Sequence, residues 1–276
     1  MGSLAAPAWQ TLHDVARGDL LPARLVLHSA AQLLRAYALE FVPEAADGAH
    51  TALYWHPETQ EFGTDAADAD APPLFLHPGS LTLRYGTEAR LALPGETLEG
   101  ALEWLGARAG PAGKLEVEPA RVPQHELRAG GVFPPADAAH AELARWFHDA
   151  HLALNVLAAG NPSWSPVRCW PHHFDIATLL VLDDVGVDPE DARSVGVGLS
   201  PGDEDHDDPY WYVNVWPVPA SPSLPELPIG RWHTEGWVGA VLDASEVAAR
   251  DSADQERAVR DFVAAAVEGA RSMLEV

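Results

Sequence analysis

Apolar residues recur at helical spacing in four segments of the chain and alternate with polar residues in the segments between. The helical spacing predicts helices over 24–41, 96–110 and 137–159, and Pro22 and Pro43 lie where prolines bound the first of them. The C-terminal segment has the most regular i, i+3, i+4, i+7 stripe. It consists of Val259, Phe262, Val263, Ala266, Val267, Ala270 and Leu274.

Short alternating segments follow the first helix of each half, and the order helix, strands, helix occurs twice. In the second half these segments are PVRCWPHHFDIATLLVL, SVGVGLSPGD, PYWYVNVW and RWHTEGWVGAVL. The repeated order predicts an α+β fold with a mainly antiparallel sheet, packed helices and two similar halves from an internal duplication. We expect an N-terminal α+β half over 1–110, a connecting segment over 111–136 and a C-terminal α+β half over 137–276 that carries the candidate site.

The composition narrows the classes of partner. With 276 residues, 47% of them hydrophobic, the chain can form a real core in one large domain or two ordinary ones. Its 41 acidic and 17 basic residues give a net charge of −24, which repels nucleic acids and anionic membranes. We therefore expect no nucleic-acid or membrane partner and take a small-molecule ligand as the candidate partner. The composition does not predict the oligomeric state.

Cysteine usage and the N-terminus bear on the compartment. Cys169 is the single cysteine, so the chain makes no intramolecular disulfide and no cysteine zinc cage. The N-terminus lacks a basic stretch followed by an apolar run, and no apolar stretch reaches the ~18 residues of a membrane span. These features predict a cytoplasmic protein.

The stretch WPHHFDIATLL, 170–180, contains the first candidate polar site. If 172–180 is a strand, alternation places His173 and Asp175 on one face. A histidine and a carboxylate at i, i+2 can ligate one metal ion or form a base with its orienting acid. The alternative is structural: the histidine bonds to the backbone and Asp175 ends a turn.

The segment PYWYVNVW supplies a second group of candidates. Alternation places Tyr210, Tyr212, Asn214 and Trp216 on one face and apolar residues on the other. Such amphipathic side chains often wall a ligand pocket, because they offer apolar area with a polar tip. The alternative is a sheet face covered by a helix, with each hydroxyl bonded to the backbone.

Two further segments extend the same site. His233 and Glu235 form another histidine–acid pair at i, i+2. Gly196 and Gly198 leave one strand face bare, which lets a backbone, an aromatic ring or a ligand come close. Asp203 belongs to a predicted type II turn at the mouth of the tyrosine strand, whereas the remaining acids of 203–208 are expected to be solvated.

The order of these motifs resembles that of a family of bacterial proteins of unknown function. The matching motifs are W-P-x-H-F-D-x-A, G-x-S-P-G-D and P-Y-x-Y-V, with Gln32 in a similar N-terminal helix. They comprise Trp170, Pro171, His173, Phe174, Asp175, Ala177, Gly198, Ser200, Pro201, Gly202, Asp203, Pro209, Tyr210, Tyr212 and Val213. The resemblance implies that these residues occur together, and it supplies no reaction.

Two hypotheses for function follow from these segments. The first is a small-molecule-binding, hydrolase-like enzyme acting on a polar, sugar-like substrate, with one divalent metal ion as candidate cofactor. Its candidate catalytic residues are His173, Asp175, His233 and Glu235; its candidate substrate-binding residues are Trp170, Asp203, Tyr210, Tyr212 and Trp232; its candidate metal ligands are His173, Asp175 and His233. The second is a non-catalytic ligand-binding or structural module whose histidines are satisfied in the core.

Overall fold

The chain folds into two compact units, each described here by itself. A computed structural model describes residues 7–13, 15–16, 18–65, 72–110, 115–183, 191–220 and 224–274. Unit 1 comprises Met1–Ala16, Arg145–Val167 and Asp175–Val276, and unit 2 comprises Arg17–Ala144 and Arg168–Phe174.

This division differs from the predicted halves in two places. The boundary falls within a long helix after Ala144, not in the predicted connecting segment 111–136, of which 111–114 lie outside the described residues. In addition, the segment Arg168–Phe174 belongs with the N-terminal part of the chain. The reason is strand pairing, since Cys169 lies opposite Leu53 in an antiparallel ladder.

In its described ranges, unit 2 has an antiparallel sheet and two complete α-helices. The sheet has the order β6-β1-β2-β3-β4-β5 and is a meander from β1 to β5. Its strands are β1 (Leu53–His56), β2 (Glu61–Thr64), β3 (Leu74–His77), β4 (Thr82–Tyr85), β5 (Ala89–Ala92) and β6 (Arg168–Trp170). Its helices are α1 (Leu21–Phe41) and α2 (Leu98–Ala109), and four 3-10 turns lie at Ala49–Thr51, Pro78–Ser80, Pro119–Arg121 and Glu126–Ala129.

A polar stripe on helix α1 holds the turn that follows β6. His28 Nε2 donates to the Pro171 carbonyl at 2.9 Å, and Gln32 Nε2 donates to the same oxygen at 2.5 Å. The His28 ring also stacks on Phe174, with ring centroids 5.4 Å apart. Burial lowers the pKa of His28 to about 4, against the weaker opposing effect of its bond to Pro171. These two hydrogen bonds and the stacked ring of Phe174 fix the turn against α1.

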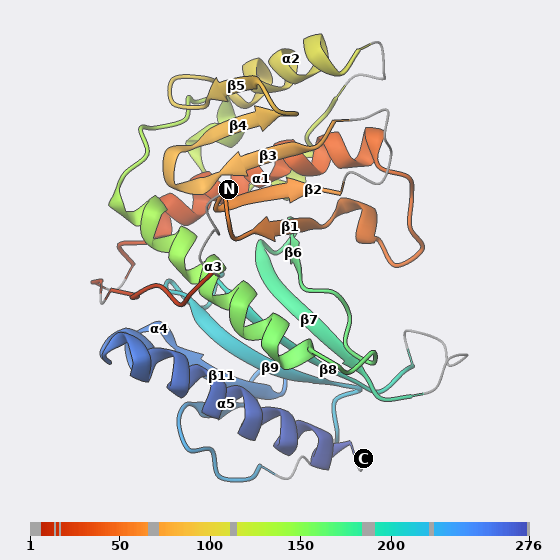
Figure 1. The fold of residues 1–276 in the computed structure, drawn as a ribbon, viewed down its shortest axis with the longest axis vertical. Coiled ribbons are helices and arrows are strands. Elements are labelled where there is room, and N and C mark those ends of the chain that lie inside the picture. Colours follow the sequence, from red (N-terminus) through yellow and green to blue (C-terminus); the bar gives the residue numbers. More distant parts are fainter. Residues whose placement is uncertain are drawn as a thin grey trace, which may run out of the picture. The chain divides into compact units, whose positions relative to one another are not determined.

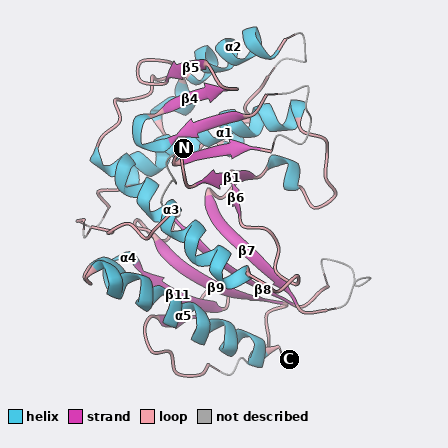
Figure 2. Cartoon of the chain, in the orientation of Figure 1, coloured by secondary structure: helices cyan, strands magenta, loops and turns pink. Residues whose placement is uncertain are grey.

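Unit 1 consists of antiparallel strands with helices on one face (Figures 1 and 2). The strand order is β10-β11-β9-β8-β7. The strands are β7 (Asp175–Val181), β8 (Ser194–Ser200), β9 (Tyr210–Trp216), β10 (Arg231–His233) and β11 (Gly239–Asp243). The helices are α3 (Ala138–Ala158), which begins in unit 2 and continues into unit 1, α4 (Ala244–Ala248) and α5 (Ser252–Met273).

The core of unit 1 lies between this sheet and helices α3 and α5, which cross the same face of the strands in Figure 1. The sheet contributes the alternate positions of each strand, and Trp211 and Val213 of β9 are fully buried. The predicted apolar stripe of α5 is confirmed, with Val259, Phe262 and Ala266 buried against the sheet. The alternation of β9 therefore reflects one packed face and one face without these helices.

The predicted α+β class and antiparallel sheet are confirmed. Both units have the order helix, antiparallel strands, helix, but their strand numbers and strand orders differ, so the duplication stays a prediction. Among the helices described, none combines the length and apolar character needed to cross a membrane.

Candidate functional site

The face of the unit 1 sheet opposite α3 and α5 carries most of the predicted polar side chains. On β9 the exposed fraction rises along this face, from 8% at Tyr210 through half-buried Tyr212 and exposed Asn214 to 50% at Trp216. The ladder places Gly198 of β8 between Tyr212 of β9 and Ala177 of β7. The predicted alternation of β9 is confirmed, because the pleat sends successive side chains to opposite faces.

The bare glycine face of β8 is occupied by side chains from β9. A Cβ at Gly198 would lie 2.5 Å from the hydroxyl oxygen of Tyr212, so the tyrosine lies directly across this strand. Its hydroxyl then donates to the carboxylate of Asp175 on β7. The Asn214 side chain lies over Gly196 in the same way. Of the predicted occupants, an aromatic ring approaches Gly198, whereas an amide side chain approaches Gly196.

A second tyrosine–carboxylate pair lies beside the first. The Tyr210 hydroxyl donates to Asp203 at 2.5 Å, and the rings of Tyr210 and Tyr212 are 6.2 Å apart. Burial and then the bond to Asp203 raise the pKa of Tyr210 above its usual range, so its hydroxyl keeps its proton at neutral pH.

Asp203 organises the loop between β8 and β9. Its carboxylate accepts the backbone N–H groups of Asp205 at 2.9 Å and His206 at 2.8 Å, and the Nδ1–H of His206 at 3.3 Å. Burial alone would raise the pKa of Asp203. The hydrogen bonds from Tyr210 and from the two backbone N–H groups outweigh burial and hold the pKa below its usual value. Asp203 is therefore an ionised acceptor at the position predicted for it.

Residues from the β10–β11 hairpin continue the arrangement. The ring centroids of His206 and His233 are 6.3 Å apart, and those of His233 and Trp237 are 4.6 Å apart. The His206 ring also lies 4.5 Å from that of Tyr210. These contacts connect three parts of unit 1 on one face. We call this set the tyrosine–carboxylate array; it comprises Asp175, Asp203, His206, Tyr210, Tyr212, His233 and Trp237.

Two predicted site residues belong to unit 2 and lie outside the array. Strand β7 begins at Asp175, so the predicted strand over 172–180 is wrong at its start and His173 does not share a strand face with Asp175. The N–H groups of His173 and Phe174 both bond to the Trp170 carbonyl, which closes a turn, and Phe174 has a φ of 58°. His173 is exposed on this turn, and Trp170 contacts His172 with ring centroids 5.8 Å apart.

Two further predictions near His233 are corrected. Strand β10 ends at His233, so Glu235 does not continue it, and the His233 Nε2–H bonds to the backbone carbonyl of Glu235 at 2.6 Å instead of to its carboxylate. Trp232 is on the helix side, where its indole packs near Gly269 of α5 and its Nε1–H donates to the Pro225 carbonyl at 2.6 Å. The half-buried indole of Trp232 therefore packs against α5 and does not wall the array.

The structure also corrects the predicted metal ligands. His173 lies in unit 2, and Asp175 and His233 lie on β7 and β10. Three strands separate β7 from β10, so the strand spacing puts about 19 Å between them. Across the described ranges, no three histidine, cysteine, aspartate or glutamate side chains are grouped so that they could hold a metal ion.

His206 and Trp237 are functional candidates that the predicted site residues do not include. His206 lies in the loop 203–208, whose acids other than Asp203 the sequence predicts to be solvated. A signal was nevertheless present, since His206 follows Asp203 by three residues, the spacing at which a side-chain oxygen can accept a backbone N–H. Trp237 lies over Gly239, and the two-residue alternation that groups His233 with Glu235 also predicts Trp237 on their face.

Comparison of the chain with known protein families, with curated proteins and with solved structures finds no match. The fold and the array therefore carry the functional argument.

The Tyr210→Phe substitution is expected to raise the pKa of Asp203, because it removes the strongest hydrogen bond that stabilises the carboxylate. A depressed carboxyl pKa stabilises the fold at neutral pH, and this contribution is lost as the pH falls through the folded pKa. Since the Asp203 side chain is 42% exposed, the effect on stability should stay below about 1 kcal/mol. Carboxyl ¹³C NMR titration measures the pKa. Tyr212→Phe is the matched control and should leave the pKa of Asp203 in place.

Proposed function

We propose that the tyrosine–carboxylate array binds a small, neutral, hydroxyl-rich ligand, a sugar or a polyol. The observation that carries the proposal is the pair of tyrosines, each donating to its own carboxylate and lying side by side with ring centroids 6.2 Å apart. Ligand sites combine apolar area with a few convergent polar groups, and tyrosine and tryptophan supply both.

The chemistry of the array favours ligands that donate hydrogen bonds. The hydroxyl protons of Tyr210 and Tyr212 are already committed to carboxylates, so their oxygens are left as acceptors. The ionised carboxylate of Asp203 adds further acceptor capacity. An anionic ligand would be repelled by these carboxylates and by the net charge of −24. Hydroxyl groups fit, and the rings of Trp237 and His233 offer faces on which an apolar sugar face can stack.

A hydrolytic activity is the second candidate, and the His206–Asp203 contact favours it. The imidazole Nδ1 lies 3.3 Å from the carboxylate, the arrangement of a general base with its orienting acid. This pair replaces the two histidine–acid pairs predicted from the sequence. If the protein is a hydrolase, His206→Gln abolishes turnover of the bound ligand and changes the binding affinity by no more than a few-fold. If it is a binding module, neither the parent chain nor the variant turns the ligand over.

We also propose that the protein is cytoplasmic, that it has no nucleic-acid or membrane partner, and that it belongs to a bacterial family. We propose in addition that its halves descend from one duplicated unit. The strongly acidic composition and the repeated order of elements support them.

Ligand binding is tested by saturation-transfer NMR with a panel of monosaccharides, polyols and sugar acids, followed by calorimetry of the strongest binders. We expect neutral sugars or polyols to bind and sugar acids to bind more weakly. Trp237→Ala and Tyr212→Phe should each weaken binding about tenfold, since the loss of one such contact contributes roughly 1–1.5 kcal/mol. Tyr54→Phe on β1 is the matched control. Binding that survives in both array variants, or no binding by any neutral sugar or polyol, would refute the proposal.

A further inference from the structure

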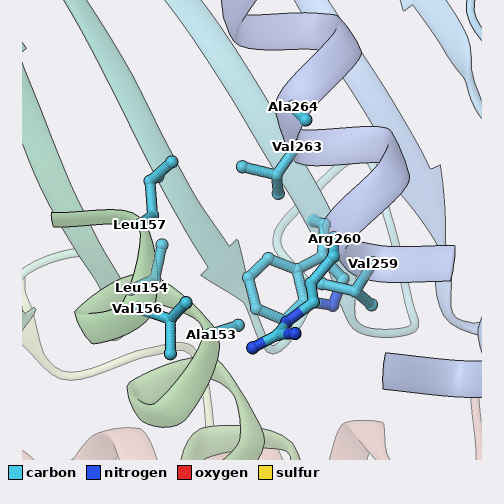
Figure 3. A pocket seen from close by; sticks show the side chains of 9 residues that line it. Ala153, Leu154, Val156, Leu157, Val259, Arg260, Val263 and Ala264 are labelled. Atoms are coloured by element: carbon cyan, nitrogen blue, oxygen red, sulfur yellow. The ribbon is translucent and has the colours of Figure 1, made fainter. Parts of the chain in front are cut away.

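A pocket lies on the other face of the unit 1 sheet, between α3 and α5 (Figure 3). Its volume is about 260 Å³. Three parts of unit 1 line it, namely the end of α3, the middle of α5 and one residue of β9. The lining residues are Ala153, Leu154, Val156, Leu157, Trp211, Val259, Arg260, Val263 and Ala264. The pocket is therefore separate from the tyrosine–carboxylate array, which occupies the opposite face.

The lining of this pocket is apolar except at Arg260. Arg260 is the charged residue of the lining, and in Figure 3 its guanidinium reaches from α5 toward Ala153 of α3. Its Nε is 3.4 Å from Glu256, which leaves the two terminal nitrogens of the guanidinium able to bind an anion. Trp211 of β9 adds an indole ring to the lining, and the residue is fully buried.

We propose that this pocket binds an amphiphile with an unbranched hydrocarbon chain and a single anionic head, such as a medium-chain carboxylate. Local charge supports an anionic head, because Arg260 is the charged residue of an otherwise apolar lining. Size supports a slender ligand, because the volume lies below the ~300–1,000 Å³ of typical drug-sized sites. Val156 lines the pocket and is 56% exposed, so this side of the pocket is open to solvent.

The affinity should depend on both ends of the ligand. Each methylene that enters an apolar site contributes about 0.8 kcal/mol, so affinity should rise about fourfold per methylene until the pocket is full. The carboxylate at Arg260 should make octanoate bind at least fivefold more tightly than 1-octanol and octylammonium. Calorimetry of hexanoate, octanoate, decanoate and these two analogues, below their micellar concentrations, measures both trends.

Three variants locate the site. Arg260→Gln should remove the preference for octanoate over octanol and keep the dependence on chain length. Ala264→Phe, at an exposed position of the rim, should block binding of every member of the series without affecting the core. Arg257→Gln is the matched control, since Arg257 is exposed on the same helix and pairs with Asp254 at 2.7 Å away from the pocket. Sugar binding to the array should not change in any of the three.

Several outcomes would overturn the proposal. These are no saturable octanoate binding at millimolar concentration, equal affinity for octanoate, octanol and octylammonium, or unchanged binding in Ala264→Phe. A change of oligomeric state in Ala264→Phe, measured by light scattering, would instead assign the pocket to contact between copies of the chain. Failure of sugar binding alone would leave this inference intact, so the two proposals are tested separately.

Discussion

The Gly198→Val substitution is expected to remove the Tyr212–Asp175 contact, abolish ligand binding to the array and lower the free energy of unfolding. A Cβ at this position would lie 2.5 Å from the Tyr212 hydroxyl oxygen and 2.6 Å from Cζ, so the ring must move. It would also lie 2.8 Å from the carbonyl oxygen of Ile176, a backbone atom that cannot rotate away. Overpacking of this kind costs about 1–3 kcal/mol, and the displaced tyrosine cannot reach Asp175.

Urea denaturation and calorimetry with the array ligand measure the two effects. Gly106→Ala is the matched control, because Gly106 lies in α2, a Cβ there meets no atom within 4 Å, and the change should stabilise the helix by about 0.5–1 kcal/mol. Adding Tyr212→Ala to Gly198→Val should restore part of the stability without restoring binding. If Gly198→Val alone keeps the affinity of the parent chain, the position of Tyr212 is irrelevant to binding and the array is not the site.

The parts of the site that the sequence predicted are those fixed by the two-residue period of a strand. Alternation alone separates Tyr210 and Tyr212 from Trp211, and a strand with glycine at alternate positions must leave one face open. The pairing of Gly198 with Tyr212 depends on the register between neighbouring strands. That register follows once the apolar positions of both strands face the same helices.

The parts that could not be predicted depend on where strands end and on contacts between loops. Phe174 adopts a positive φ, which non-glycine residues rarely do, so nothing in the sequence marked the turn that separates His173 from β7. The pairing of β6 with β1 is a long-range contact that local patterns do not encode. His206 reaches the array only because the carboxylate of Asp203 folds its loop back, and an acidic run gives no sign of this.

Acidification from pH 7 to pH 4 is expected to destabilise unit 2 by several kcal/mol. Burial, together with neighbouring cationic groups, lowers the pKa of both His28 and His172 to about 4. For His28 the largest effect is burial, which lowers the pKa. The hydrogen bond to Pro171 raises it by less, and repulsion from Arg24 lowers it further. For His172 the largest cause of the lowered pKa is burial, followed by repulsion from His173 and from Arg121 and Arg35.

The sign of the effect follows from proton binding. In the unfolded chain a histidine takes up its proton near pH 6.5, whereas in the folded unit it stays neutral until about pH 4. Between these values the unfolded state binds more protons, so the free energy of unfolding falls as the pH falls. The full contribution is present above pH 6.5 and is lost by about pH 4. Its upper bound is roughly 3 kcal/mol for the more deeply buried His28 and less for half-buried His172, whose charge is screened by solvent.

The His28→Gln variant isolates one of the two contributions. Glutamine can still donate to the Pro171 carbonyl, which Gln32 also binds, but it does not titrate, so the fold at pH 7 should be little changed. Hydrogen exchange of unit 2 amides, measured from pH 7 to pH 4.5, should then show a smaller loss of stability in the variant than in the parent chain. His13→Gln, at an exposed position of unit 1, should leave that loss unchanged. An identical pH dependence in His28→Gln and the parent chain would mean that His28 binds its proton equally well in the folded and unfolded states, and that burial does not keep it neutral.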